Sequence, residues 1–251
     1  MQPGVPAVWT FAYLIMSMGL FVVWLVLYWL RTDLRGTMFR VSLVTALLGL
    51  TEPLFVPKYW NPYTLFDLAR RTGFDLESLL FSFAIGGIVF AAYGVFFRVA
   101  SSESMASERH KHRHRHHILA LAAPYVTFVV VALLTDLNPI YSSAIALTAG
   151  FLATLYCRPD LWLKMIISGG LFLAVYFIVF VSFNLGFPGY VVAVWNLPAI
   201  SGVRLVGVPL EELMFAFAFG LYWSSVYEHL MWRREHAVVV GGAKMRAVGH
   251  R

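Results

Sequence analysis

Two adjacent glutamates, Glu211 and Glu212, stand at the beginning of an apolar run that continues to about residue 232. A charged side chain inside a membrane is costly unless it faces the interior of the protein, so such residues are candidates for function. Paired carboxyl groups with different proton affinities are what general acid and base catalysis requires. The sequence therefore indicates proton transfer, and the next question is which segments bring further carboxyl groups to these two.

The segment that contains these glutamates occurs twice in the chain. Residues 73–93 and 207–227 share nine identities in 21 positions, and Glu77 is the counterpart of Glu211. Even in a biased composition, roughly two identities would be expected by chance. The chain is therefore interpreted as an internal duplication.

An upstream turn repeats as well. Residues 31–38 return at residues 158–165, with Asp33 and Asp160 at the same place in each copy. Aspartate is favoured at the beginning of a helix, so we expect both aspartates to cap the helices that follow.

The composition is that of an integral membrane protein, because 60% of the residues are hydrophobic and only 13% are charged. A membrane-spanning helix requires about 20 apolar residues. We expect seven spans, at residues 8–30, 37–55, 76–97, 118–134, 138–157, 162–184 and 208–231. Three spans reverse the chain, so a fourth is needed before the second triplet can run parallel to the first. The predicted fold is all-α, with two parallel three-helix repeats joined by a linker helix, a 3+1+3 arrangement.

The predicted divisions of the chain follow from these spans. Residues 1–98 form the first repeat, residues 99–136 a basic His-rich loop with the linker helix, residues 137–232 the second repeat, and residues 233–251 a cytoplasmic tail. The 19 lysines and arginines fall 15 to 4 on alternate sides of the spans. This predicts a multi-pass protein of the cytoplasmic membrane with its N-terminus outside and its C-terminus inside. The positive charge thus reflects topology and not nucleic-acid binding.

The His-rich loop and the single cysteine are weaker signals. Five of the eight residues from His110 to His117 are histidines, but interleaved arginines oppose a bound cation, so we expect a solvated loop and no metal site. Cys157 is expected to be a small apolar residue near the end of a helix. Residues 208–231 contain no lysine, which excludes a retinal Schiff base of the rhodopsin type.

Carboxyl groups from both repeats are predicted to lie near one outer level of the membrane. Glu52 ends the second span, Glu77 begins the third, and Glu211 and Glu212 begin the last. We expect these four candidate catalytic residues to face each other across a cleft between the repeats. Aromatic rings nearby could stabilise a cation, although helix packing explains many of them. The candidate substrate-binding residues are Phe81, Phe215, Phe219, Trp60, Trp195, Asn61 and Asn196.

These motifs together resemble the membrane-bound lycopene cyclase domain family, the bacterial, archaeal and fungal type made of duplicated three-helix units. The residues that carry the resemblance are Trp195-Asn196, Pro209-Leu-Glu211-Glu212, Phe215 and Phe217. The first repeat departs from the pattern, because Asp75 replaces the proline and Ser78 replaces the second acid, which leaves Glu77 alone.

The resemblance implies a carotenoid cyclase, an isomerase that closes a ring at the end of a linear polyene such as lycopene. A carboxylic acid, Glu211 or Glu212, would protonate a terminal double bond, and Glu77 would have the complementary base or electrostatic role, or the reverse. The reaction has no net redox change, so no cofactor and no metal are expected. The expected partners are the apolar polyene substrate and the lipid bilayer. Other carotenoid-biosynthesis enzymes or a second copy of the chain are further candidates, and no nucleic acid is expected.

Two alternatives remain open from the sequence. Small-solute transporters of the SWEET type also have parallel three-helix repeats joined by a linker helix, but they carry Pro-Gln elements where this chain has Pro-Leu-Glu-Glu. A non-catalytic subunit or partner of a carotenoid-biosynthesis complex is the second alternative, because the first repeat lacks part of the motif.

Overall fold

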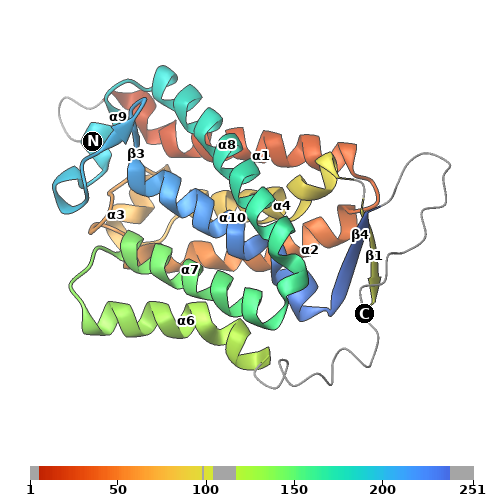
Figure 1. Ribbon diagram of the computed structural model, residues 1–251. Helices are drawn as coiled ribbons and strands as arrows, with labels where there is room; N and C mark the ends of the chain where they lie inside the picture. The colour runs from red at the N-terminus through yellow and green to blue at the C-terminus, as the bar shows by residue number, and fades with distance from the viewer. Residues whose placement is uncertain (1–5, 98, 104–116, 238–251) are drawn as a thin grey trace.

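The computed structural model describes residues 6–97, 99–103 and 117–237 of the 251-residue chain (Figure 1). Long helices occupy all the predicted ranges to within a few residues. They are α1 (Ala12–Leu30), α2 (Arg35–Ala46) with its 3-10 continuation η2 (Leu47–Leu54), α4 (Leu76–Phe96), α6 (His117–Leu134), α7 (Pro139–Cys157), α8 (Trp162–Gly186) and α10 (Leu210–Leu230). Most of the His-rich loop, at residues 104–116, and the tail from residue 238 lie outside the described residues.

Short elements connect the long helices. The helical ones are η1 (Ala7–Phe11), η3 (Leu65–Asp67), α3 (Leu68–Thr72), η5 (Pro159–Leu161), α9 (Tyr190–Val194) and η6 (Leu197–Ala199). The strands are β1 (Val99–Glu103), β2 (Arg204–Leu205), β3 (Val208–Pro209) and β4 (Arg233–Ala237). They form two small antiparallel pairs, β1 with β4 and β2 with β3.

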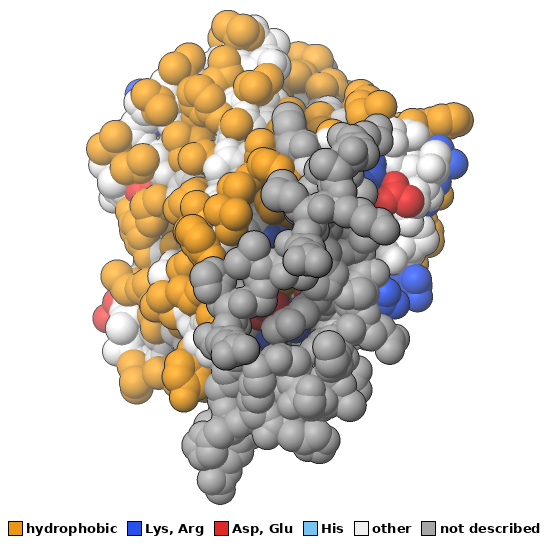
Figure 2. All heavy atoms as spheres, turned by 45° about the vertical axis from the view of Figure 1, so that its right-hand side comes forward, with side chains coloured by type: hydrophobic (Ala, Val, Ile, Leu, Met, Phe, Trp, Pro, Cys, Tyr) orange, Lys and Arg blue, Asp and Glu red, His pale blue; other side chains and the backbone are white. Residues whose placement is uncertain are grey.

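The chain is an all-α membrane protein. Within its described part, five helices are long and apolar enough to cross a membrane: Val8–Leu30, Leu76–Val95, His117–Leu134, Pro139–Cys157 and Pro159–Gly186. Large apolar side chains are exposed along them, and Figure 2 shows such side chains over much of the described surface. The remaining long segments are less apolar, because α2 carries Arg35 and Arg40 and α10 carries three glutamates. All three glutamates of α10 are buried inside the protein.

Helices α4 and α10, which contain the two copies of the repeated glutamate segment, lie at the centre of the molecule (Figure 1). Helix α10 packs against α8, α7 and α4, while α4 packs against α1, α2 and α8. Small residues allow the closest approach, since a Cβ atom on Gly220 of α10 would lie 2.8 Å from the Cα atom of Gly169 in α8. Helix α6 packs mainly against α7.

Backbone pairings at both ends of the molecule join residues that the duplication makes equivalent. In the β1–β4 ladder Ser101 lies opposite Glu235, which is 134 residues later in the chain. At the opposite end, Trp60 and Trp195 form an antiparallel bridge. An antiparallel pair of equivalent residues has a local two-fold axis between its strands. These pairings therefore support the internal duplication inferred from the sequence.

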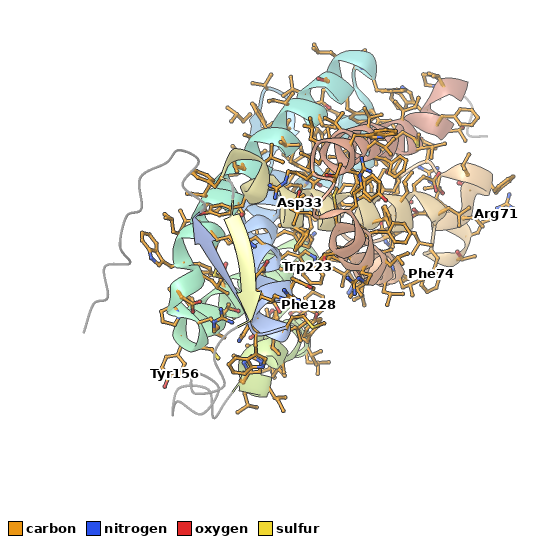
Figure 3. The ribbon with its side chains drawn as sticks, turned by 90° about the vertical axis from the view of Figure 1, so that its right-hand side faces the viewer. Asp33, Arg71, Phe74, Phe128, Tyr156 and Trp223 are labelled. Atoms are coloured by element: carbon orange, nitrogen blue, oxygen red, sulfur yellow. The ribbon has the colours of Figure 1, made fainter. Side chains whose placement is uncertain are left out.

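The repeated turns use their aspartates differently from the prediction. Asp33 accepts hydrogen bonds of 2.9 and 2.6 Å from Arg31, and Asp160 accepts bonds of 2.9 and 2.7 Å from Arg158 (Asp33 is labelled in Figure 3). Helices α2 and α8 begin without a side-chain cap, so the capping prediction was wrong. The arginine two residues upstream offers the carboxylate a bidentate partner instead.

Candidate functional site

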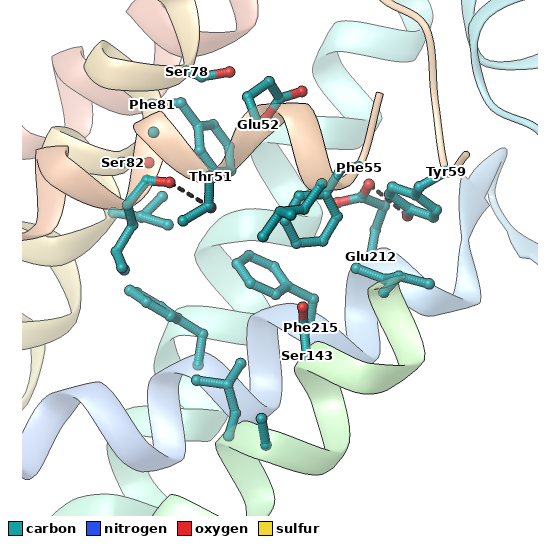
Figure 4. A pocket seen from close by; sticks show the side chains of 18 of the residues that line it. Thr51, Glu52, Phe55, Tyr59, Ser78, Phe81, Ser82, Ser143, Glu212 and Phe215 are labelled. Atoms are coloured by element: carbon teal, nitrogen blue, oxygen red, sulfur yellow. Dashed lines mark hydrogen bonds between the residues drawn. The ribbon is translucent and has the colours of Figure 1, made fainter. Parts of the chain in front are cut away.

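A mainly apolar cavity of about 330 Å³ lies between η2, α4, α6, α7 and α10. This volume is within the range of about 300–1,000 Å³ that is usual for small-molecule sites. Figure 4 shows side chains from these elements turned toward the same space, among them Phe81 from α4 and Phe215 from α10. Two carboxyl groups, those of Glu52 and Glu212, line the cavity.

Glu212, in the first turn of α10, is held by three hydrogen-bond donors. Its Oε1 accepts from the Tyr59 hydroxyl at 2.7 Å and from Trp195 Nε1 at 2.9 Å, and its Oε2 accepts from the Tyr176 hydroxyl at 2.5 Å. An indole N–H can only donate, and a carboxylate accepts at both oxygens. The arrangement thus suits the ionised form of Glu212, even though only 7% of this residue is exposed.

The donor character of Tyr59 follows from its environment. Tyr59 lies in the connection after η2, where its side chain is buried. Burial, together with the neighbouring Glu212, raises the pKa of the Tyr59 hydroxyl well above its ordinary value. The phenol therefore stays protonated, and its O–H donates a hydrogen bond to the carboxylate of Glu212.

Glu52, in η2, accepts a short hydrogen bond from a tryptophan. Trp60 Nε1 donates to its Oε1 at 2.6 Å. Glu52 lies in a 3-10 segment, which has three residues per turn where an α-helix has 3.6 residues per turn. The direction of its side chain therefore differs from the direction that a continued α-helix would give. Ser78, the counterpart of Glu212 in the first repeat, lies beside Glu52 (Figure 4), and its small side chain leaves room for this carboxyl group.

The two carboxyl groups are thus anchored by equivalent tryptophans. Trp60 and Trp195 occupy the same position in the two repeats, pair through their backbones and have ring centroids 5.0 Å apart. Each indole N–H donates to a carboxyl group that lines the cavity. The carboxyl groups themselves come from elements that are not equivalent, because Glu52 lies in η2 and Glu212 in α10.

Glu77 and Glu211 lie outside the cavity, although the sequence placed them opposite each other. The backbone N–H of Leu65 donates to Glu77 Oε1 at 2.7 Å, and that of Ser201 donates to Glu211 Oε1 at 2.9 Å. Tyr141 also donates to Glu211, at 2.6 Å. The equivalent glutamates thus hold the connections that precede their helices. Successive residues of an α-helix point about 100° apart, and here Glu212 faces the cavity while Glu211 does not.

All five aromatic side chains proposed for substrate binding line the cavity, and the asparagines do not. The ones that line it are Phe81, Phe215, Phe219, Trp60 and Trp195. Asn196 instead donates from Nδ2 to the Lys58 carbonyl at 3.1 Å, and the backbone N–H of Asn61 donates to the Val194 carbonyl at 2.8 Å. Both asparagines thus join the two outer connections to each other.

Sequence reasoning missed three hydroxyl groups at the site, those of Tyr13, Tyr59 and Tyr176, which all line the cavity. Tyr59 lies beside the repeated Trp-Asn pair, which was a usable signal. Tyr176 lies in the middle of the apolar helix α8, where a lone tyrosine is usually read as packing.

The match to known proteins falls on the half of the chain that contributes Trp195 and Glu212. Residues 138–230 match the family model for lycopene cyclase. The matched segment runs from the beginning of α7 to the end of α10, and the family resemblance is confirmed over these residues. No curated protein and no solved structure matches the chain.

Proposed function

We propose that the protein is a carotenoid cyclase that closes a ring at the end of a linear polyene by proton transfer. The observation that carries this proposal is an apolar cavity lined by two carboxyl groups in unlike hydrogen-bonding environments, next to aromatic rings. The lycopene cyclase domain at residues 138–230 supports the same activity.

In this proposal Glu52 is the acid. Its Oε1 accepts from Trp60, so the other oxygen is the one that carries a proton. Glu212 is the ionised partner, because three donors hold it. A pair of carboxyl groups whose surroundings favour opposite protonation states is the arrangement expected for an acid and its complementary base.

The reaction then proceeds in three steps. Glu52 gives its proton to the terminal double bond, which leaves a positive charge on the tertiary carbon. The π electrons of a neighbouring double bond attack that carbon and close a six-membered ring, which moves the charge to a ring carbon. A proton leaves the adjacent carbon for Glu212, and its bonding electrons become the ring double bond. One proton is gained and one is lost, so no redox partner is needed.

The surroundings of the two carboxyl groups suit a cationic intermediate. Ring faces attract cations by their quadrupole, and Phe81, Phe215 and Phe219 lie around the cavity. The ionised Glu212 adds a full negative charge in a site of low dielectric constant, where electrostatic stabilisation is strongest. Water is disfavoured by the apolar walls, which protects the cation from capture.

We further propose that all seven long helical segments cross the membrane as two parallel three-helix repeats with α6 as the linker, with the N-terminus outside. The backbone pairing of equivalent residues supports this arrangement. The substrate would enter from the bilayer between η2 and α6. Both elements line the cavity, but α2, which η2 continues, packs on α4, and α6 packs on α7.

The experiment is expression of the full chain in cells that accumulate lycopene, with pigment analysis by chromatography. We expect conversion of lycopene to a ringed isomer of the same mass. Unchanged lycopene in cells whose membranes contain the protein would refute the cyclase proposal for this substrate. Uptake of sugar into vesicles with the protein would support the transporter alternative, which no contact described above favours.

A further inference from the structure

Three potential metal ligands meet at the end of the molecule opposite the cavity carboxyl groups. His117 begins α6, Cys157 ends α7 and His229 is in the last turn of α10, and these helix ends lie together in Figure 1. One ligand atom from each residue can be chosen so that all three lie within 4.8 Å of one another. Cys157 and His229 are buried, at 1% and 0% exposure.

The distances fit a metal centre. Cys157 Sγ lies 3.5 Å from His117 Nδ1. Zinc bonds of about 2.3 Å to sulfur and about 2.05 Å to nitrogen, at a tetrahedral angle, place the two ligand atoms about 3.5 Å apart. No two of the three ligand atoms are more than 4.8 Å apart, so the third ligand has to move inward by no more than about 1.5 Å, which a side-chain rotation can supply.

The neighbours of the histidines help to orient them. Thr154 Oγ1 lies 3.4 Å from His229 Nδ1, so this hydroxyl can accept a hydrogen bond from Nδ1–H. The other ring nitrogen, Nε2, is then unprotonated and available as a metal ligand. The His117 ring stacks on Trp232 with centroids 4.3 Å apart, and it meets the His229 ring edge-on at 4.5 Å. Both rings are therefore held by contacts before any ion binds.

Two cationic side chains that neighbour the cluster are each paired with a carboxylate. Lys164 forms a buried ion pair of 2.7 Å with Glu228, the residue before His229, and Arg158, the residue after Cys157, pairs with Asp160. Each positive charge is thus matched by a carboxylate. A bound thiolate would neutralise half of the charge of a divalent ion.

We propose that His117, Cys157 and His229 form a binding site for a thiolate- and imidazole-preferring divalent cation of the Zn²⁺ type. Two imidazoles and one thiolate are ligands that such ions prefer, and a solvent molecule completes the tetrahedron. The bound ion links the first turn of α6 to the C-terminal ends of α7 and α10. Since Tyr125 and Phe128 of α6 line the cavity, the ion also fixes one wall of the candidate substrate site.

The test uses the full chain in lipid nanodiscs, freed of metal with a chelator and titrated with Co²⁺. Cys157 is the only cysteine in the sequence, so a thiolate-to-cobalt charge-transfer band reports this site alone. We expect the band to saturate at one equivalent and to disappear when Zn²⁺ is added. Cys157→Ser should abolish it, and His229→Asn should weaken Co²⁺ binding at least tenfold.

The matched control replaces the four loop histidines, His110, His112, His114 and His116, with asparagine. This variant should keep the band, because the loop is not part of the proposed site. A folded wild-type protein that shows no band would overturn the proposal and leave an ordinary thiol–imidazole hydrogen bond. Loss of the band in the loop variant would also overturn it. If Cys157→Ser does not fold, the wild-type band and its displacement by Zn²⁺ decide the question.

Discussion

Replacing Glu212 with glutamine removes the negative charge from the proposed site and preserves most of the surrounding geometry. The amide oxygen can take the place of Oε1, which accepts from Tyr59 and Trp195, and the amide nitrogen can face the Tyr176 hydroxyl, which is able to accept. Hydrogen bonds to a charged group contribute about 1.5–3 kcal/mol each and those to a neutral group about 1 kcal/mol. Each of the three bonds loses about 0.5–2 kcal/mol, so we expect a loss of about 1.5–6 kcal/mol in unfolding free energy, reduced by the smaller desolvation cost of a neutral amide, and a protein that still inserts.

The effect on catalysis should be much larger than the effect on stability. General acid and base groups contribute factors of about 10²–10⁴ in rate, so Glu212→Gln should reduce ring formation by that order. The assay measures ringed product against lycopene by chromatography, normalised to the amount of protein in the membrane fraction.

Glu211→Gln is the matched control, because it makes the same chemical change in the next residue of the same helix. Glu211 is also buried and hydrogen bonded, but its partners are Tyr141 and Ser201 and it does not line the cavity. We expect this variant to retain most of its activity. Normal product from Glu212→Gln, or equal losses in both variants, would refute the assignment of the site.

Three further substitutions test other parts of the structure. Glu52→Gln should stop the first proton transfer and lower product formation by at least about 10²-fold in the same assay, with the protein still in the membrane. Trp195→Phe removes one of the three donors to Glu212, so we expect slower but measurable cyclisation and about 1–3 kcal/mol less stability in thermal unfolding. Lys164→Met leaves the Glu228 carboxylate buried without its ion-pair partner, at a cost of about 3–5 kcal/mol, and adding Glu228→Gln should recover most of that loss. A thermal transition in Lys164→Met equal to that of the wild type would mean that this ion pair contributes nothing.

The long helices could be predicted from the sequence because long apolar runs have few structural solutions. The duplication also indicated equivalent residues, and the pairing of Trp60 with Trp195 agrees with it. The direction in which each glutamate points was harder to obtain. For Glu211 and Glu212 it depends on the rotation of α10 about its axis, which decides which of the two faces the cavity. For Glu52 it depends on the change from the α-helix α2 to the 3-10 segment η2. Neither feature has a signature in the apolar pattern.

The duplication helps to explain why the repeated glutamates, Glu77 and Glu211, do not line the cavity. Glu77 and Glu211 each accept a backbone N–H from the preceding connection, as equivalent residues of a duplication can. Ring closure by proton transfer needs one group to give a proton and another to receive it. The proposed pair meets this requirement because Glu52 and Glu212 are not equivalent. In a duplicated protein that catalyses proton transfer, the acids that break the repeat are therefore better candidates for the chemistry than those that follow it.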